Sequence, residues 1–478
     1  MSDLQEIKES LSESLQQVIS ILEKHKLVEN LVHKQDMPKH DLVEGLVYKQ
    51  NQQELQNKLE VLHPADVAYI LEALPLDDRL HVWNLVKTER DGEILLEVSD
   101  AVRQTLIADM DNEELFAAAE QLDADELADL APDLPKDVLQ DLLHSLDAQN
   151  RERLQSTLSY ADDAVGALMD FDIVTIREDI SLEVALRYLR RLENLPDHTD
   201  KLFVVDRNNV LNGVLPLKRL VVNELEVKVS DIMIEDAVAF HPEDTASDAA
   251  KAFERYDLVT APVVDADNKL VGRLTVDAVM DFIREDAEAD MFSMAGLREE
   301  EDYFSSIWAS VQNRWAWLAV NLVTALVASR VIGLFEGSIE KIVALAALMP
   351  IVAGIGGNSG NQTTTMIVRG LALGQISSHN MHSLIKKELG VALLNGLIWG
   401  GVLGLIAYII YKNMFLGLVM MSAMTLNLLL AAMMGVMIPF LMTKFGRDPA
   451  VGSSVLITAM TDSGGFMIFL GLATIFLM

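Results

Sequence analysis

"PIVAGIGGNSGNQTTT", residues 350–365, interrupts a long apolar segment with helix-breaking glycines and hydrogen-bonding side chains. In hydrocarbon, irregular backbone is tolerated only where it is buried in protein or lines a watery cavity. The four glycines therefore predict a bent or unwound membrane span: Gly354, Gly356, Gly357 and Gly360. Three amides would point into its polar interior: Asn358, Asn361 and Gln362. Tight helix packing through small residues is the alternative, but the amides and the threonines that follow favour a pore lining.

Five apolar runs follow Arg314, and each reaches the length of about 20 residues that crosses the hydrocarbon core as a helix. We expect membrane spans over residues 315–335, 342–367, 389–411, 415–443 and 450–478. With the N-terminal side in the cytosol, six basic residues flank the spans on the inside and three on the outside. The positive-inside rule supports this orientation, which places the C-terminus outside the cytoplasm. The expected location is a bacterial plasma (inner) membrane.

The last span, "LITAMTDSGGFMIFLGLATIFLM" (residues 456–478), contains Asp462 in the middle of an apolar run. A lone carboxylate at that depth costs several kcal/mol, and no basic residue lies near the centre of any span to pair with it. Asp462 is therefore expected to face water, a proton or a cation. Thr461, Ser463 and the next two glycines add hydroxyl and carbonyl oxygens, which are ligands suited to magnesium, calcium or manganese.

Charge separates the chain into two parts. Residues 1–300 carry 65 acidic and 29 basic side chains, a net charge of −36, whereas the rest carries 7 acidic and 9 basic side chains, a net charge of +2. Such acidity argues against nucleic acid as a partner, and either favours cations or serves solubility. The chain has no Cys, which excludes disulfides and thiolate metal sites. Its polar N-terminus lacks the features of a secretory signal, so the acidic part is expected in the cytosol.

The acidic part begins with a repeat of period 60. "LHPADVAYILEALP" (residues 62–75) matches "LDADELADLAPDLP" (residues 122–135). Self-similarity in helix-forming sequence predicts an α-solenoid of stacked helical hairpins. We expect it over residues 51–160. A helical extension over residues 1–50 would cap it, with apolar residues recurring at Leu11, Leu15, Val18, Ile19 and Leu22.

A second repeat pairs "LFVVDRNNVLNGVL" (residues 202–215) with "APVVDADNKLVGRL" (residues 261–274). Each unit predicts strands and helices in the order typical of CBS domains, over residues 161–228 and 229–283. CBS pairs often bind adenine nucleotides, with a Thr or Ser that contacts the ribose and an Asp three residues later. Thr275 fits the first position, but Ala278 occupies the second and Asp277 lies one residue early. ATP binding is therefore open, with Thr275 as a weak candidate.

Between the CBS units and the membrane lies "VDAVMDFIREDAEADMFSMAG", residues 276–296. Steps of four, four and three place Asp277, Asp281, Glu285 and Glu288 on one helical face, and Asp286 and Asp290 form a neighbouring row. Like charges at this spacing repel unless cations intervene. This face is either simply solvated or a cation sensor. We expect a connecting helix over residues 277–310 and a membrane domain over residues 311–478.

The chain resembles the MgtE family of magnesium channels and transporters. The resemblance rests on an ordered set of features: an acidic solenoid, a CBS pair, an acidic linker helix, "PIVAGIGGNSGNQ" and an intramembrane Asp. "SYADDAVGALM" (residues 159–169) resembles the family's junction between solenoid and CBS pair. The resemblance implies a multidomain fold, with an α-solenoid, an α/β CBS pair, a plug helix and an all-α transmembrane domain of five helices. It also implies a homodimer in the bilayer, with a pore along the subunit interface lined by the second and fifth spans.

The resemblance implies an ion pathway for Mg²⁺ at Asp462, Thr461, Gly357, Asn358, Asn361 and Gln362. It further implies that regulatory Mg²⁺ bridges solenoid, CBS pair and plug. The matching carboxylates are Asp125, Asp129, Asp257, Asp277, Asp281, Asp286 and Asp290. At high cytosolic Mg²⁺ the bound ions would hold the plug shut, and at low Mg²⁺ the acids would repel and the pore would open.

Three other functions compete with a magnesium channel. A secondary transporter of divalent cations could couple Mg²⁺ or Co²⁺ to a counter-ion through Asp462. A CBS-regulated anion channel is disfavoured by a carboxylate in the pore without Lys or Arg at depth. An enzyme is disfavoured because the sequence has no Walker loop, no HExxH and no recognisable Ser-His-Asp signature.

Overall fold

The computed structural model describes residues 11–24, 26, 40–192, 194–297, 302–372, 375–376 and 380–478. The expected N-terminal extension, residues 1–50, lies partly outside them. The chain forms two compact units. Unit 1 comprises Met1–Asp286 together with Asp302–Ser305, and unit 2 comprises Ala287–Glu301 together with Ser306–Met478.

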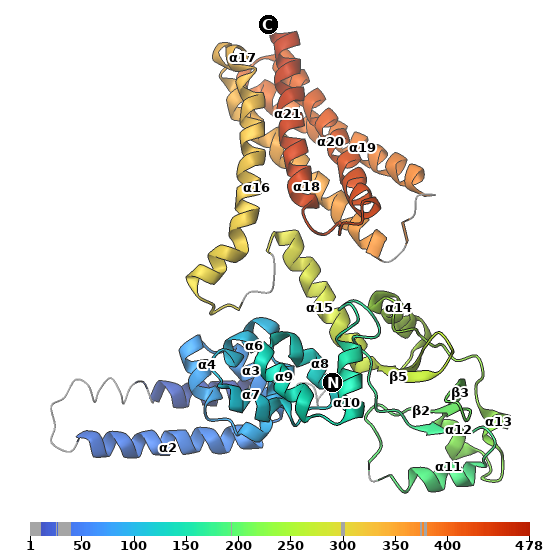
Figure 1. The fold of residues 1–478 in the computed structure, drawn as a ribbon. Helices are drawn as coiled ribbons and strands as arrows, with labels where there is room; N and C mark the ends of the chain where they lie inside the picture. Colours follow the sequence, from blue (N-terminus) through green and yellow to red (C-terminus); the bar gives the residue numbers. More distant parts are fainter. Residues whose placement is uncertain are drawn as a thin grey trace. The chain divides into compact units, whose positions relative to one another are not determined.

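Unit 1 begins with a helical domain of short, stacked helices (Figure 1). They are α2 (His40–Val61), α3 (Pro64–Glu72), α4 (Leu76–Trp83), α5 (Asp91–Glu97), α6 (Asp100–Ile107), α7 (Asn112–Ala119), α8 (Ala124–Leu130), α9 (Lys136–Ser145) and α10 (Ala148–Thr157), with 3₁₀ turns at Thr88–Arg90 and Ala131–Asp133. The repeat of period 60 is visible in this order, because Pro75 precedes α4 as Pro135 precedes α9. Helix α8 starts with a capping box in which the side chains of Asp123 and Glu126 satisfy free backbone N–H groups.

One apolar core runs through the helical domain. The helix over residues 11–24 contributes Val18, Ile21 and Leu22 to that core, so the N-terminal helix packs on the domain as its apolar spacing predicts. Helix α2 continues across the boundary expected between residues 50 and 51. The sequence there has neither Gly nor Pro to end a helix.

The CBS pair follows. The first repeat contains β1 (Thr175–Ile176), α11 (Leu182–Leu189), β2 (Lys201–Val205), β3 (Leu211–Pro216) and α12 (Leu217–Val222). The second contains α13 (Val229–Ile232), α14 (Ala246–Tyr256), β4 (Thr260–Val264) and β5 (Leu270–Thr275). Strands β2 and β3 form an antiparallel hairpin, as do β4 and β5, and both hairpins shift register at the equivalent position.

The two hairpin turns explain the sequence repeat. The Asp206 carboxylate accepts from the backbone N–H groups of Asn208 and Val210, at 2.7 and 2.9 Å. Asp265 makes the equivalent pair of bonds in the second hairpin. An Asn three residues later adopts a left-handed conformation in both turns, which Asn tolerates better than most residues.

Unit 2 is a bundle of long helices: α16 (Ile307–Gly333), α18 (Ala344–Ala372), α19 (Met381–Tyr411), α20 (Met414–Lys444) and α21 (Ser453–Leu477), with the short α17 (Glu336–Lys341) after α16. Among the described residues, four helices are long and apolar enough to cross a membrane, namely α16, α19, α20 and α21. Helix α18 has the length but is diluted by its Gly, Asn, Gln and Thr residues. Helix α20 packs against α18, α19 and α21 and forms the centre of the bundle.

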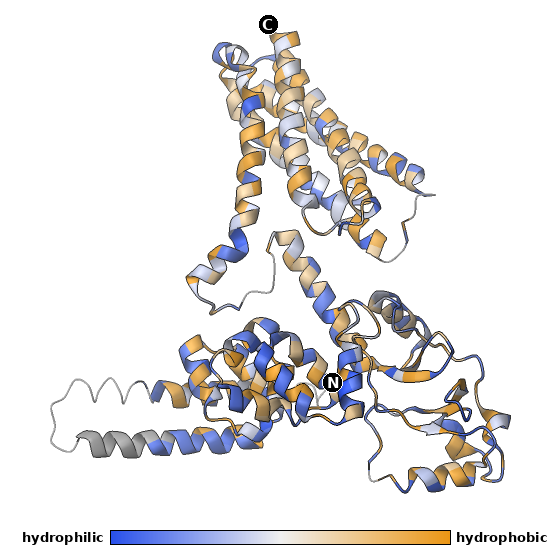
Figure 2. Ribbon diagram, in the orientation of Figure 1, coloured by the Kyte–Doolittle hydropathy of each residue, from blue (hydrophilic) through white to orange (hydrophobic). Residues whose placement is uncertain are grey.

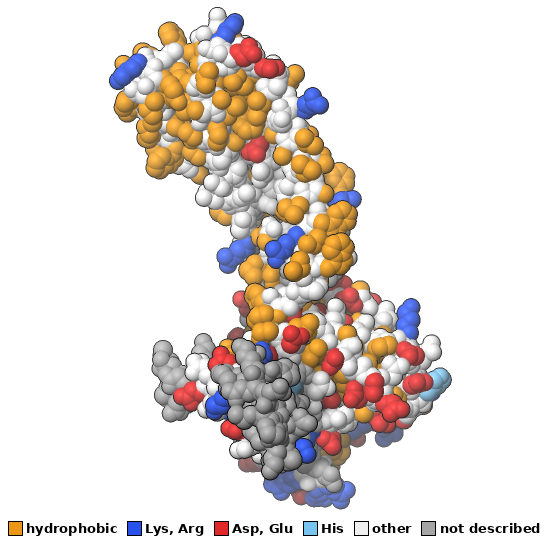
Figure 3. All heavy atoms as spheres, turned by 90° about the vertical axis from the view of Figure 1, so that its left-hand side faces the viewer, with side chains coloured by type: hydrophobic (Ala, Val, Ile, Leu, Met, Phe, Trp, Pro, Cys, Tyr) orange, Lys and Arg blue, Asp and Glu red, His pale blue; other side chains and the backbone are white. Residues whose placement is uncertain are grey.

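Hydropathy follows the same division. Orange residues dominate the helices of unit 2, whereas blue residues are frequent in unit 1 (Figure 2). The space-filling view shows acidic side chains gathered on unit 1 and hydrophobic side chains covering unit 2 (Figure 3). The exposed apolar side chains of α16 and α19 include Leu318, Leu322, Leu394 and Ile398. Such a surface fits contact with lipid.

The connection between the CBS pair and the bundle differs from the single helix expected over residues 277–310. Helix α15 (Val276–Ala295) ends at Gly296, which has a left-handed φ of 84°. Helix α16 begins at Ile307, after Ser306 caps it by accepting from the N–H of Ala309. The start of α16 therefore precedes the apolar run expected from Trp315, because capping rather than hydrophobicity determines where the helix begins.

Candidate functional site

We expected this span to be bent or unwound; helix α18 is continuous through residues 350–365, so the unwound form is wrong. The glycines allow close packing instead of breaking the helix. A Cβ at Gly356 would lie closer than 3.0 Å to the Asn427 side chain of α20, and a Cβ at Gly360 would lie equally close to Ile457 of α21. Backbone hydrogen bonds are thus kept within the helix, while neighbouring helices occupy the space that side chains would need.

A polar row nevertheless runs along another side of α18. Gly354, Asn358 and Gln362 follow steps of four and are all exposed in the single chain. Asn361 is half-buried, and its Oδ1 is buried without a hydrogen-bond partner in the described part of the chain. Amides are costly to leave against lipid, so this row requires water or protein beside it.

Helices α18 and α21 meet at the predicted ion pathway. A Cβ at Gly357 would lie 3.7 Å from the Thr461 hydroxyl oxygen, which is ordinary contact distance. Thr461 is buried, and its hydroxyl donates to the carbonyl oxygens of Ile457 and Thr458, at 2.9 and 3.2 Å. The structure therefore brings together Gly357 and Thr461, which lie far apart in the sequence.

Asp462 follows Thr461 on α21 and is half-buried. Across the described ranges, no ion pair or hydrogen bond of its side chain is found. The next residue, Ser463, has a buried hydroxyl oxygen without a hydrogen-bond partner among those residues. A carboxylate beside unsatisfied oxygens can bind a cation or its water shell.

Asn427, in the middle of α20, is a polar residue that the sequence analysis did not single out. Its side chain is fully buried, and its Nδ2 donates to the carbonyl oxygen of Val352 on α18, at 2.9 Å. It also fills the space left by Gly465 of α21, as it does at Gly356. Asn427 thus fixes α18 against α21. An isolated amide inside an apolar span was the signal that could have identified it.

Glu388, near the start of α19, is a second acid missed as a site residue. It is buried, its Oε2 accepts from the Thr363 hydroxyl of α18 at 3.4 Å, and its Oε1 lies 3.3 Å from Lys387 Nζ. An adjacent lysine and a hydroxyl therefore offset its charge. Its contacts attach α19 to the segment that follows the polar row of α18.

Within unit 1, carboxylates from three segments come close enough to repel one another. Burial, and then the charge of Asp170, raise the pKa of Asp125 to about 6. Asp129 is exposed at its surface, yet desolvation by the protein packed around it, followed by the charge of Asp125, raises its pKa to about 7. Glu285 of α15 adds to the repulsion at Asp129, whereas Arg103 opposes it. Two of the predicted sensor residues, Asp125 and Asp129, thus lie in one group of carboxylates that repel one another.

The other predicted sensor residues are more dispersed. Asp257 ends α14 in a left-handed conformation and is exposed. Asp277 and Asp281 are exposed on α15, with His198 and Arg284 at 3.6 Å from their respective carboxylates. Asp286 is exposed and Asp290 is half-buried. Nowhere among the described residues are three His, Cys, Asp or Glu side chains arranged to hold one metal ion.

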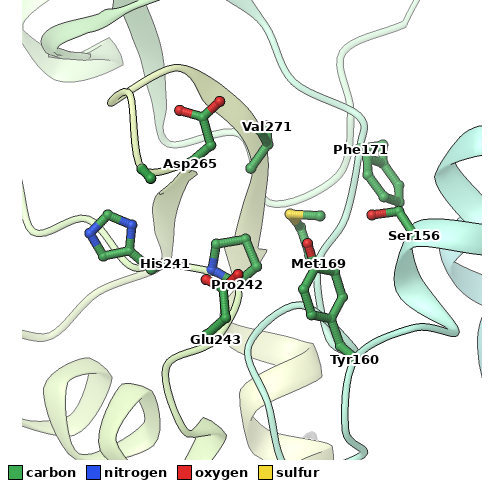
Figure 4. Close-up of a pocket in the computed structure, with 10 residues that line it drawn as sticks. Ser156, Tyr160, Met169, Phe171, His241, Pro242, Glu243, Asp265 and Val271 are labelled. Carbon is green, nitrogen blue, oxygen red and sulfur yellow. The ribbon is translucent and has the colours of Figure 1, made fainter.

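A cavity of about 500 Å³ lies where the end of the helical domain meets the second CBS repeat (Figure 4). Tyr160, Met169 and Phe171 approach it from one side, and His241 and Asp265 from the other. Thr275, the weak nucleotide candidate, does not line it. That residue is buried at the far end of the β4–β5 hairpin, opposite Thr260.

Comparison with protein families gives matches along most of the chain. Residues 62–163 match the MgtE intracellular N domain, and residues 165–224 and 229–285 match the CBS domain. Residues 349–472 match the MgtE family of divalent cation transporters.

Two curated relatives cover nearly the same length. The magnesium transporter MgtE of Thermus thermophilus is 30% identical over 431 residues, which is 88% of this chain and 95% of that protein. The magnesium transporter MgtE of Bacillus subtilis is 27% identical over 425 residues, 89% of this chain and 94% of that protein. Among solved structures, the cytosolic domain of the Mg²⁺ channel MgtE in complex with ATP is 29% identical, with a TM-score of 0.45 over 50% of this chain and 97% of that one.

Proposed function

The chain belongs to the MgtE family of magnesium transporters, and we propose that it is a homodimeric, magnesium-selective channel that cytosolic Mg²⁺ closes. It would admit Mg²⁺ down its electrochemical gradient through a bacterial plasma membrane, with the cytosolic domains inside and the C-terminus outside. The observation that carries this proposal is a polar row on α18 and a carboxylate, Asp462, on α21, two helices that meet at Gly357 and Thr461 in an otherwise apolar bundle.

The exposure of that row supports a second copy of the chain. Gly354, Asn358 and Gln362 are exposed in one chain and would face lipid if it acted alone. Two copies that meet along α18 and α21 would cover the row and enclose a polar path, with Asp462 presented from both sides. Because Mg²⁺ holds its octahedral water shell tightly, paired carboxylates and amides would recognise the hydrated ion through its waters.

The acidic group of unit 1 supports closure by Mg²⁺. The pKa values of Asp125 and Asp129 of α8 and of Glu285 of α15 are raised, because partial desolvation and neighbouring carboxylates penalise their charged forms. A divalent cation would relieve this repulsion and hold α8 beside α15. Preferential binding to the closed arrangement shifts the population toward it, and several sites acting together need only modest preferences. Asp257, Asp277, Asp281, Asp286 and Asp290 remain proposed sensor residues.

Closure should depend on pH because protons compete with Mg²⁺ at Asp129. Its pKa of about 7 means that the carboxyl is mostly ionised at pH 8 and mostly protonated at pH 6. A bound metal requires the ionised form, so the Mg²⁺ concentration for half-closure should rise by about fivefold as the pH falls from 7 to 6. Flux into proteoliposomes, measured with a Mg²⁺ dye at each pH, tests this.

Asp129→Asn is the matched variant for that experiment. It removes the titrating group but keeps the shape of the side chain. It should require more Mg²⁺ for closure at pH 8 and lose most of the change between pH 7 and 6. If the variant keeps the full pH dependence of the wild type, another group titrates and Asp129 is not a sensor residue.

We assign no regulatory role to a nucleotide at the CBS pair, because Thr275 is buried and the residue three positions later is Ala278.

The experiment that tests the proposed function is flux through the wild-type chain with only a membrane potential and a Mg²⁺ gradient. Flux that follows the potential and stops at high cytosolic-side Mg²⁺ supports a gated channel. Flux that appears only with a proton or sodium gradient indicates a secondary transporter instead.

A further inference from the structure

A buried ion pair joins the helical domain to the segment that leads into the first membrane helix. Arg79 Nη1 lies 2.6 Å from Asp302 Oδ2, and Arg79 Nη2 lies 2.9 Å from Asp302 Oδ1. The side chains are 0% and 3% exposed. This bidentate geometry, with two parallel N–H···O hydrogen bonds, is a strong arrangement of guanidinium and carboxylate. Here it connects residues 223 positions apart.

Arg79 is fixed within the helical domain independently of Asp302. Its Nε donates to the carbonyl oxygen of Leu71 at 2.8 Å, and Nη2 donates to that of Leu74 at 3.2 Å. Both acceptors lie at or just after the end of α3, where helix carbonyls lack partners in the helix itself. The guanidinium therefore belongs to the α3–α4 corner, and its outer edge is available to one carboxylate.

Asp302, in contrast, lies in a short connecting segment. Its Oδ1 also accepts from the N–H of Phe304 at 3.0 Å, which folds residues 302–305 into a turn. Ser306 follows directly and caps α16. Residues 302–305 belong to unit 1, whereas Ser306 belongs to unit 2. The ion pair thus attaches the helical domain to the first residue of the membrane bundle through covalent chain.

We propose that Arg79 and Asp302 are positioning residues for gating: they dock residues 302–305 on the helical domain and thereby restrain α16 while the channel is closed. This inference rests on the proposed closure by Mg²⁺. It adds a second mechanical link between the cytosolic domains and the bundle, in addition to α15. The linker could leave the domain only if two buried charges separated, which is strongly unfavourable until both reach water. Docking is therefore a two-state contact that movement of the helical domain can make or break.

Asp302→Asn tests the docking in the full-length chain in proteoliposomes. The amide keeps an Oδ1 acceptor for the Phe304 N–H but removes the charge that binds Arg79. Hydrogen exchange of the peptide that contains residues 302–306 should accelerate at high Mg²⁺. The Mg²⁺ concentration for half-closure should rise by at least about fivefold, the lower end of typical coupling between sites. Tyr303→Ala is the control, since Tyr303 is 95% exposed in the same segment, and it should change neither quantity.

Arg79→Gln supplies the second arm and distinguishes coupling from loss of structure. If both residues act through their contact, the double variant Arg79→Gln with Asp302→Asn should shift half-closure no further than the larger single shift. Additive shifts would overturn the proposal. So would unchanged exchange in Asp302→Asn, or faster exchange with normal closure. If wild-type flux ignores Mg²⁺, the proposed gating fails, and the inferred role of the pair in gating fails with it, whereas exchange still decides whether the linker is docked.

Discussion

Replacing Asp462 by alanine should reduce magnesium flux at least about 100-fold, which corresponds to about 2.7 kcal/mol of barrier height. A carboxylate about 5 Å from a divalent cation, across one water layer, attracts it by about 7 kcal/mol at an effective dielectric constant near 20. The neighbours of Asp462 on α21, Thr461 and Ser463, offer hydroxyl and carbonyl oxygens, none of which carries a full charge. Initial Mg²⁺ uptake into proteoliposomes, normalised to inserted protein, measures the loss.

Two further variants show whether charge or shape matters at this position. Asp462→Asn keeps the size of the side chain and should be nearly as inactive as alanine, whereas Asp462→Glu keeps the charge and should retain more flux. Glu340→Gln removes an exposed acid of α17, outside the long helices, and should transport normally. Normal flux in Asp462→Ala would make Asp462 a structural acid and would remove the proposed ion pathway.

Local patterns in the sequence were sufficient for most of the architecture. The match of residues 202–215 with residues 261–274 predicted two equivalent units of strands and helices, and it is a local pattern because each hairpin turn is built from hydrogen bonds within a few residues. The period-60 repeat likewise predicted stacked helical hairpins, since Pro75 and Pro135 stop one helix and start the next in the same place.

Long-range pairings could not be predicted in this way. Arg79 and Asp302 are unremarkable charged residues in sequence, and only the fold brings them into contact. The unwinding expected of α18 was wrong for a related reason. A glycine makes a solvated helix more flexible. It improves helix packing when a neighbouring side chain occupies the space that a Cβ would take. The sequence of α18 does not show which neighbour that is. Asn427, whose side chain occupies the space beside Gly356, lies on another helix.

Gly356→Ala should destabilise the bundle by about 1–3 kcal/mol and impair transport, because the added methyl group overlaps the buried Asn427 amide. The Asn427 amide cannot simply move away. It is fully buried, and it donates to the carbonyl oxygen of Val352, which lies on α18 with Gly356. Relief therefore requires α18 to shift relative to α20 or the hydrogen bond to break. Either change would displace Gly357 from Thr461, where we place the ion pathway.

Gly354→Ala, one half-turn earlier in α18, separates this packing effect from the general effect of removing a glycine. No atom lies within 4 Å of a Cβ at Gly354 in the single chain, so helix propensity alone should make this variant neutral or slightly more stable there. Thermal unfolding in detergent and Mg²⁺ flux should be measured on both variants. Equal loss of thermal stability in both would mean that α18 needs its glycines for flexibility, whereas a loss of flux alone in Gly354→Ala would reflect the place of Gly354 in the polar row. Loss in Gly356→Ala alone would show that Asn427 holds α18 in register with the ion pathway.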